Sequence, residues 1–260
     1  MVDNLVYFAL KMGQGDVIAF AIVLGILFHY RKEDFEQSAC FVCFVIIFNT
    51  LLKNLFKIPL FPNLGPGYAF PSGHMHVATI FYGYFFYRAQ NYTEKVIFAT
   101  ILGCIASAIV YCHFHDWYDI AGAIAFAFSE IAIYHILRKK YKTMPTPAIF
   151  ILPVITAFYT LQLIYGAKDY NWMALYIFSG ITVGRELCWI SLTKWSQKCL
   201  ALLLWTGIVT MIYLLNGIAS IQLRIVFGQL RFFLFSIAIY FAIRMAANII
   251  KSDGQGLPEK

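Results

Sequence analysis

Two short polar stretches interrupt an otherwise apolar chain, and each places a histidine beside other groups that could do chemistry. The first is Pro71-Ser72-Gly73-His74, which stands where a long apolar segment begins. The N-terminus of a helix offers unpaired N–H groups and the positive end of the helix dipole, so it attracts phosphate. The pattern predicts an anion-binding turn, with the Ser72 hydroxyl and the Gly73 amide as donors and the His74 imidazole beside them.

The second stretch, residues 113–119, contains His115 and Asp119 four positions apart. This spacing is one helical turn, so the carboxylate can hold one ring nitrogen of the imidazole and leave the other free to attack. Two imidazoles, a carboxylate and an anion-binding turn together indicate phosphoryl transfer through a histidine, which needs no metal or other cofactor. Asp116 is predicted as the N-cap of the following helix.

The composition is that of an integral membrane protein. Of the 260 residues, 61% are hydrophobic and 13% are charged, and the mean hydropathy is +0.71. Soluble domains carry roughly 25% charged residues. The net charge of +7 fits basic loops that face a cytoplasm and anionic lipid, and no basic run is long enough to follow a nucleic-acid backbone. The six cysteines lie mostly in apolar runs, which favours packing over disulfides, and no cleavable signal is evident.

The polar stretches must be positioned by the apolar segments around them. A helix that crosses a membrane needs about 20 apolar residues, and the chain offers about nine such segments. Residues 1–12 are too short to cross and alternate at helical spacing, which predicts an interfacial helix. The predicted fold class is an all-α polytopic transmembrane bundle. The spans run over about residues 16–30, 38–56, 72–87, 96–111, 118–137, 148–165, 173–192, 200–215 and 232–250.

Charge asymmetry between the turns predicts the orientation of the bundle. The positive-inside rule assigns basic turns to the cytoplasm, and here every second turn is basic. Both polar stretches then lie on the extracytoplasmic side, with His76 and His113 as polar residues near the membrane surface. The basic turns contain Arg31-Lys32, Arg88 with Lys95, Arg138 to Lys142, Lys194 with Lys198, and the end after Ile250.

Two prolines, Pro145 and Pro147, follow the largest basic turn and mark a boundary in the chain. Residues 1–142 hold both polar stretches and are predicted to form the catalytic core. Residues 143–251 form a transmembrane extension, and residues 252–260 form a polar tail. The predicted location is a bacterial inner membrane with the active site on the extracytoplasmic side.

The chain resembles the type-2 phosphatidic acid phosphatase family, which comprises membrane lipid phosphatases related to the vanadium haloperoxidases. That family carries the motifs Lys, six residues, Arg-Pro; Pro-Ser-Gly-His; and Ser-Arg, five residues, His, three residues, Asp. Pro71-Ser72-Gly73-His74 matches the second motif in full. Lys53 matches the head of the first motif, and His115 and Asp119 match the end of the third. The match covers roughly residues 1–140.

The resemblance implies a role for each matched residue. His115 would be the nucleophile that forms a phosphohistidine, and Asp119 would orient it. His74 would protonate the leaving oxygen, while Ser72 and the Gly73 amide would bind phosphate oxygens.

Lys53 and Lys57 complete the predicted substrate-binding set. They lie four residues apart at the end of the second predicted span, so both ammonium groups can share one helix face.

Both arginines that clamp phosphate in that family are replaced in this chain. Loss of one preorganised hydrogen-bond donor lowers the catalytic rate by a factor on the order of 10²–10³. The Arg-Pro positions hold Leu60 and Phe61, and the Ser-Arg positions hold Ala108 and Ile109.

Substitute charge could come from Lys57, His113 or Arg185, although lysine lacks the bidentate fork of arginine. Arg185 and Glu186 lie inside a predicted span, and adjacent helical residues diverge by about 100°. A bond from Arg185 to a neighbouring helix is therefore expected more than a ligand role.

The sequence thus predicts a membrane enzyme that hydrolyses a lipid phosphate or pyrophosphate, either an isoprenoid carrier pyrophosphate or a phospholipid head group. Its partners are that substrate and membrane lipids, with no nucleic acid. Three alternatives remain open. They are a lipid head-group phosphotransferase, a catalytically weakened lipid-phosphate binder, and a transporter.

Overall fold

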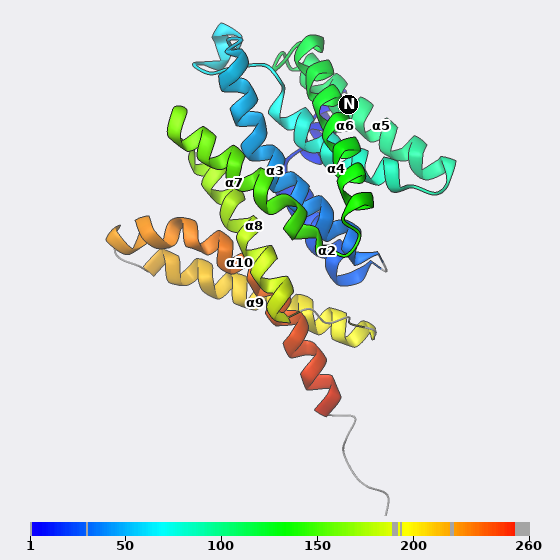
Figure 1. Cartoon of the computed structure of the whole chain (residues 1–260), viewed down its shortest axis with the longest axis vertical. Coiled ribbons are helices and arrows are strands. Elements are labelled where there is room, and N and C mark those ends of the chain that lie inside the picture. The colour runs from blue at the N-terminus through cyan, green and yellow to red at the C-terminus, as the bar shows by residue number, and fades with distance from the viewer. Residues whose placement is uncertain (1, 30, 189–191, 193, 219–220, 253–260) are drawn as a thin grey trace, which may run out of the picture. The chain divides into compact units, whose positions relative to one another are not determined.

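A computed structural model describes the whole chain except residues 1, 30, 189–191, 193, 219–220 and 253–260, and its regular elements are helices (Figure 1). The described part contains ten α-helices, one short 3-10 helix and no strand. They are α1 (Val2–Met12), α2 (Gly15–Phe28), α3 (Lys32–Phe56), η1 (Pro62–Leu64), α4 (Gly73–Arg88), α5 (Tyr92–Tyr111), α6 (Trp117–Lys140), α7 (Thr146–Ile164), α8 (Asp169–Cys188), α9 (Trp195–Ile218) and α10 (Ile221–Ser252). The predicted all-α fold is confirmed.

Six of the described helices are long and apolar enough to cross a membrane, which indicates an integral membrane protein. They are α3, α5, α6, α7, and long stretches of α9 and α10. The first two helices pass the same test together but are bent by 56° at the break between them, so the number becomes seven if they form one span. The count of nine is not confirmed, because α4 has 16 residues and α8 does not meet the hydropathy test.

The chain divides into two compact units. The first comprises the described residues of Met1–Ile22 and Gln37–Asn171, and the second comprises those of Val23–Glu36 and Trp172–Lys260. All the predicted site residues lie in the first unit. This division rests on packing, and the predicted functional boundary after residue 142 stays a prediction.

In the first unit, α4 packs against both α5 and α6 (Figure 1). The segment before α4 is seated by a close approach to α6. A Cβ atom at Gly122 would lie 2.1 Å from the Phe70 ring, so only glycine lets the ring rest on this helix. The Phe70 ring also stacks on that of Tyr118 at 4.9 Å between centroids. Phe70 immediately precedes the Pro-Ser-Gly-His turn, and these contacts therefore help to place that turn beside the start of α6.

The second unit contains a buried ionic cluster. Arg185 of α8 pairs with the carboxylate of Glu36 at the start of α3, and the Tyr240 hydroxyl of α10 donates a hydrogen bond to the same carboxylate at 2.6 Å. The predicted structural bond from Arg185 to a neighbouring helix is confirmed.

Candidate active site

Ser72 stands at the N-cap of α4, but its hydroxyl does not cap the helix. A serine at this position ordinarily accepts a hydrogen bond from a backbone amide in the first turn. Here the Ser72 hydroxyl is fully buried and has no hydrogen-bond partner among the described residues. A buried hydroxyl without a partner costs free energy, and a bound ligand would remove that cost. The geometry therefore suits the predicted anion-binding role better than a capping role.

A backbone hydrogen bond joins the two predicted polar stretches. The Ser72 amide donates to the carbonyl of Asp119 at 3.2 Å, which ties the start of α4 to the first turn of α6. Asp116 is the N-cap of α6, as predicted, and its carboxylate accepts from the Asp119 amide at 2.8 Å. Residues 47 positions apart in the chain thus meet through the main chain, independently of the side chains that would do chemistry.

His115 is positioned by the way α5 ends. The Phe114 amide bonds to the Ile109 carbonyl at 3.1 Å and the His113 amide to the Val110 carbonyl at 2.9 Å, which is a Schellman motif. His113 takes the left-handed position of that motif, with φ of 54°. Histidine is one of the few non-glycine residues enriched in this conformation. The motif turns the chain sharply and delivers His115 to the start of α6.

The His115 ring is held by Asp119 in the predicted manner. Its Nδ1 lies 2.9 Å from Oδ2 of Asp119, and both side chains are buried. Since the carboxylate accepts a hydrogen bond from Nδ1–H, the neutral ring keeps its lone pair on Nε2. Burial lowers the pKa of His115, a hydrogen bond to Asp119 opposes that shift, and the charge of Lys53 adds to it. The ring is therefore neutral, and nucleophilic, at neutral pH.

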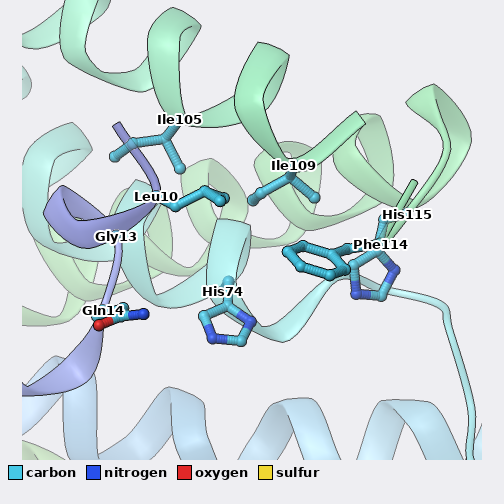
Figure 2. Close-up of a pocket in the computed structure, with 8 residues that line it drawn as sticks. All are labelled: Leu10, Gly13, Gln14, His74, Ile105, Ile109, Phe114 and His115. Carbon is cyan, nitrogen blue, oxygen red and sulfur yellow. The ribbon is translucent and has the colours of Figure 1, made fainter. Parts of the chain in front are cut away.

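His74 and His115 line the same small cavity, whose volume is about 70 Å³ (Figure 2). The exposed His74 side chain comes from the first turn of α4, so its proton can reach a bound molecule. The rest of the lining is mostly apolar. It consists of Leu10, Gly13 and Gln14 from the α1–α2 break, Ile105 and Ile109 from α5, and Phe114 from the turn that follows α5.

The two predicted lysines differ sharply in their surroundings. Lys53 is half-buried, and its ammonium group donates to the carbonyls of Tyr68 at 2.7 Å and Ala69 at 3.2 Å. It therefore holds the loop before the Pro-Ser-Gly-His turn, and its charge also acts on His115. Lys57 is exposed beyond the end of α3, with φ of 53°. Neither lysine lines the cavity, but Lys53 lies close enough for its charge to act on His115.

One of the residues that replace the family's arginines lies in the cavity wall. Ile109 is 2% exposed and lines the cavity together with both histidines. Leu60 instead lies in the loop after α3, where its amide bonds to the Gly67 carbonyl at 3.1 Å. The cavity thus presents an aliphatic side chain where the resemblance would place a guanidinium.

Several residues around the site were not predicted from the sequence. The α1–α2 break contributes to the cavity, although only an interfacial helix was expected there. The burial of His76 was not expected: its side chain is fully buried against Asn49 of α3 and Glu130 of α6. One signal was available, since Glu130 is an isolated carboxylate within a predicted span and such groups need a partner.

Within the described residues, no group of three or more His, Cys, Asp or Glu side chains is placed to hold a metal ion. The chemistry open to this arrangement is attack by the free imidazole nitrogen of His115 on an electrophile held at the Ser72 turn, with His74 as proton donor. Comparison of the chain with protein-family models, curated proteins and solved structures finds no match.

Proposed function

We propose that this protein is a membrane lipid phosphatase that hydrolyses a lipid phosphate or pyrophosphate through a phosphohistidine. The observation that carries the proposal is the His115 imidazole, held by Asp119 at 2.9 Å on one nitrogen and lining one cavity with His74. The buried, unpartnered hydroxyl of Ser72 supports a ligand with hydrogen-bond acceptors, and phosphate oxygens are such acceptors.

In the first proposed step, Nε2 of His115 attacks phosphorus and forms a P–N bond. The bond from phosphorus to the leaving oxygen breaks, and the protonated form of His74 gives its proton to that oxygen, so the leaving alcohol or lipid monophosphate carries no charge on that oxygen. Desolvation and the charge of Lys53 lower the pKa of His74, so this protonated form is a minor one at neutral pH. The Asp119 carboxylate stabilises the positive charge that develops on the ring. Ser72 and the Gly73 amide hold the oxygens of the transferring group.

In the second step, the now neutral His74 takes a proton from water, and the oxygen of that water attacks phosphorus. The P–N bond breaks, inorganic phosphate leaves, and His115 returns to its starting form. The two steps balance, because His74 gives one proton to the leaving oxygen in the first step and takes one proton from water in the second. An alcohol in place of water would yield a phosphotransferase by the same route.

The apolar lining of the cavity and the membrane helices favour a substrate whose phosphate is attached to a hydrophobic group, such as an isoprenoid carrier pyrophosphate or a phospholipid head group. The proposal includes nine crossings, with α4 as a short span, α8 as a less apolar span and α1 at the interface. It also places the site on the extracytoplasmic side of a bacterial inner membrane, because the turns at the opposite helix ends are basic.

A second candidate function is a catalytically weakened protein that binds lipid phosphate. The observation in its favour is Ile109, an aliphatic residue in the cavity wall where the resemblance calls for arginine. Without a guanidinium, the charge that develops on the transferring phosphoryl group is stabilised less. The turn and the two histidines can still hold a phosphate in that case.

The test is phosphate release from a panel of lipid phosphates and pyrophosphates by the full chain in detergent or vesicles, with and without added alcohols. His115→Ala should abolish turnover, and rapid quench with labelled lipid should trap an acid-labile, base-stable adduct in the wild type. His113→Asn is the matched control, because it removes an exposed imidazole two residues away and outside the cavity, and asparagine tolerates the left-handed conformation of this position. Equal turnover in wild type and His115→Ala rules out the covalent route. Saturable binding without any turnover supports the second candidate.

A further inference from the structure

A buried polar cluster lies beside the Pro-Ser-Gly-His turn and takes no part in the proposed chemistry. It consists of Asn49 from α3, His76 from α4 and Glu130 from α6, all in the first unit. Asn49 and His76 are buried, and the Glu130 side chain is 10% exposed. Polar groups buried in an apolar bundle cost free energy unless they pair. The pairing of these groups therefore favours one particular packing of the three helices that carry them.

The orientation of the Asn49 amide follows from its neighbours. One terminal atom of this amide lies 3.3 Å from the Pro71 carbonyl oxygen and 3.1 Å from Nδ1 of His76. A carbonyl oxygen only accepts hydrogen bonds, so the atom facing it must be the NH₂ group. The same NH₂ group faces Nδ1 of His76, which must then be the acceptor.

This orientation determines the tautomer of His76. With Nδ1 unprotonated, the ring proton sits on Nε2, and the ring is neutral. Nε2 lies 3.2 Å from Oε1 of Glu130, which is within ion-pair distance. The direction of the N–H is poor for a hydrogen bond, and neither atom has another hydrogen-bond partner among the described residues. The contact is thus electrostatic, and the negative charge of the carboxylate favours a proton on Nε2.

The cluster touches the turn at two points. Asn49 binds the Pro71 carbonyl, which directly precedes Ser72. A Cβ atom at Gly73 would lie 3.2 Å from Oδ1 of Asn49, so the amide packs closely against Gly73 itself. The His76 amide makes the first helical hydrogen bond of α4, to the Ser72 carbonyl at 2.9 Å, so the His76 side chain is one helical turn from Ser72. The two residues that flank Ser72 are therefore both held by the cluster.

We propose that Asn49, His76 and Glu130 form a positioning network that sets the orientation of the Ser72 hydroxyl and the His74 ring, with His76 fixed as the neutral Nε2–H tautomer. The expected effect on catalysis rests on the proposed function. The tautomer of His76 and the fixed conformation of the Pro-Ser-Gly-His turn do not depend on it. Asn49 and His76 touch the turn, and Glu130 acts through His76. None of the three lines the cavity.

The experiment is ¹⁵N NMR of the full chain in micelles, with histidine labelled at both ring nitrogens. The chain has six histidines, and His74→Gln and His76→Gln variants assign the two signals of interest. The wild type should show an unprotonated Nδ1 and a protonated Nε2 for His76. Asn49→Leu should give a mixture of His76 tautomers and should shift or broaden the His74 signal, because the turn loses its anchor.

Three further variants separate the network from a general loss of packing. Asn171→Leu removes another buried amide that contacts α3, bonded to Thr50 at 2.9 Å, and should leave both histidine signals unchanged. Glu130→Gln keeps an acceptor for the Nε2 proton and should preserve the tautomer, whereas Glu130→Leu should not. A wild-type His76 protonated on Nδ1 or on both nitrogens would overturn the proposal. So would an unchanged His74 signal in Asn49→Leu.

Kinetics then test the catalytic consequence. Loss of a partner that orients a metal-ligating side chain typically lowers activity about 10- to 100-fold, and we expect a loss of the same order when a residue that orients a catalytic side chain is removed. Asn49→Leu should lower kcat in that range with little change in KM, and Asn171→Leu should not. Normal kcat in Asn49→Leu would overturn the positioning role. A wild type without turnover would count against the phosphatase proposal, while the NMR result alone would still decide on the network.

Discussion

At the scale of single residues, the carboxylate of Asp119 has two separable effects on His115. It orients the ring, and its hydrogen bond raises the pKa of a buried imidazole that burial and Lys53 lower. Asp119→Asn should therefore reduce kcat by at least about 100-fold through the lost orientation. It should also move the acid limb of the kcat/KM profile to lower pH, because the interaction that favours the protonated ring is lost.

The measurement is a pair of pH–rate profiles on one lipid substrate. Ionisation of the substrate phosphate then contributes equally to both profiles, so the difference between them reports a change in the ionisation of enzyme groups. In the wild type, the limb should lie below 6.5, the ordinary pKa of histidine, since the pKa of His115 is lowered by burial. A limb that moves to higher pH in Asp119→Asn would contradict the placement of His115 as the group that must be neutral.

Lys53 contributes charge to the site and holds the loop before the Pro-Ser-Gly-His turn. Lys53→Ala should lower kcat/KM at least about 100-fold, which is about 2.7 kcal/mol of transition-state stabilisation. Lys57→Ala is the matched control, because it removes the same charge four residues away on an exposed side chain and should have little effect. Near-normal kinetics for Lys53→Ala would remove this residue from the site.

Ile109 offers a gain-of-function test. Its side chain lines the cavity beside His74 and His115, and an arginine there would place a permanent charge near the phosphate. If the missing clamp limits activity, Ile109→Arg should raise kcat/KM on lipid phosphates on the order of 10²-fold. Ile109→Met conserves volume without charge and should leave activity near the wild-type value. A folded Ile109→Arg protein without a gain would show that charge at this position is not limiting.

The contrast between His115 and His76 shows what a sequence can predict about single residues. The contact of His115 with Asp119 and the cap formed by Asp116 depend on spacings of four and three residues, and both were predicted correctly. The burial of His76 depends on Asn49 and Glu130, which are 27 and 54 positions away in the chain. Only packing of three helices brings those groups together, so the isolated Glu130 carboxylate signals that a partner exists but no local pattern identifies that partner.

At the scale of elements, the end of α5 carries strain that can be measured. His113 adopts φ of 54°, where a side chain costs roughly 1–2 kcal/mol relative to glycine. His113→Gly should therefore stabilise the protein by up to about 1 kcal/mol, after the added flexibility of the unfolded chain is subtracted. His113→Val should destabilise it, because a β-branched residue fits this conformation poorly.

Thermal unfolding in detergent measures both variants at residue 113. Because this residue is exposed and lies outside the cavity, the changes in Tm report the backbone and not the site. A Tm for His113→Val at or above that of His113→Gly would show that the Schellman motif does not constrain the turn to His115.

Among the elements around the site, the α1–α2 break is the one whose role the local sequence pattern predicted least well. Helical spacing predicted a helix over residues 1–12, and α1 is present there. The hydroxyl of Tyr82 in α4 donates to the Met12 carbonyl at 2.9 Å, and a Cβ at Gly13 would lie 3.1 Å from the Ile105 side chain. These contacts fold the break onto α4 and α5. They come from distant parts of the chain, which is why the sequence did not place it in the cavity wall.

At the scale of the whole molecule, composition was enough to predict an all-helical membrane protein but not its number of spans. The predicted third span, residues 72–87, became α4, and its 16 residues fall short of the roughly 20 that cross a bilayer. Residue count alone cannot tell a short, buried helix from a spanning one. In α4 the burial of His76, Thr79 and Tyr84 shows that much of its surface faces protein and not lipid.

Orientation in the membrane is the remaining prediction, and α6 makes it testable within the first unit. Its 24 residues correspond to about 36 Å at a rise of about 1.5 Å per residue, enough to cross a hydrocarbon core of about 30 Å. Asp119 lies in the first turn of α6 and Arg138, Lys139 and Lys140 lie in its last, so the site and the basic turn should face opposite sides.

Labelling with a membrane-impermeant thiol reagent decides the direction. In a background without the six native cysteines, Pro66→Cys reports the exposed loop between α3 and α4, and Lys140→Cys reports the exposed basic end of α6. From outside intact cells, position 66 should react and position 140 should react only after the cells are opened. The reverse pattern would place the histidines on the cytoplasmic side, where the substrate would have to be a lipid phosphate of the inner leaflet. Reaction of both positions from outside would mean that α6 does not cross the membrane.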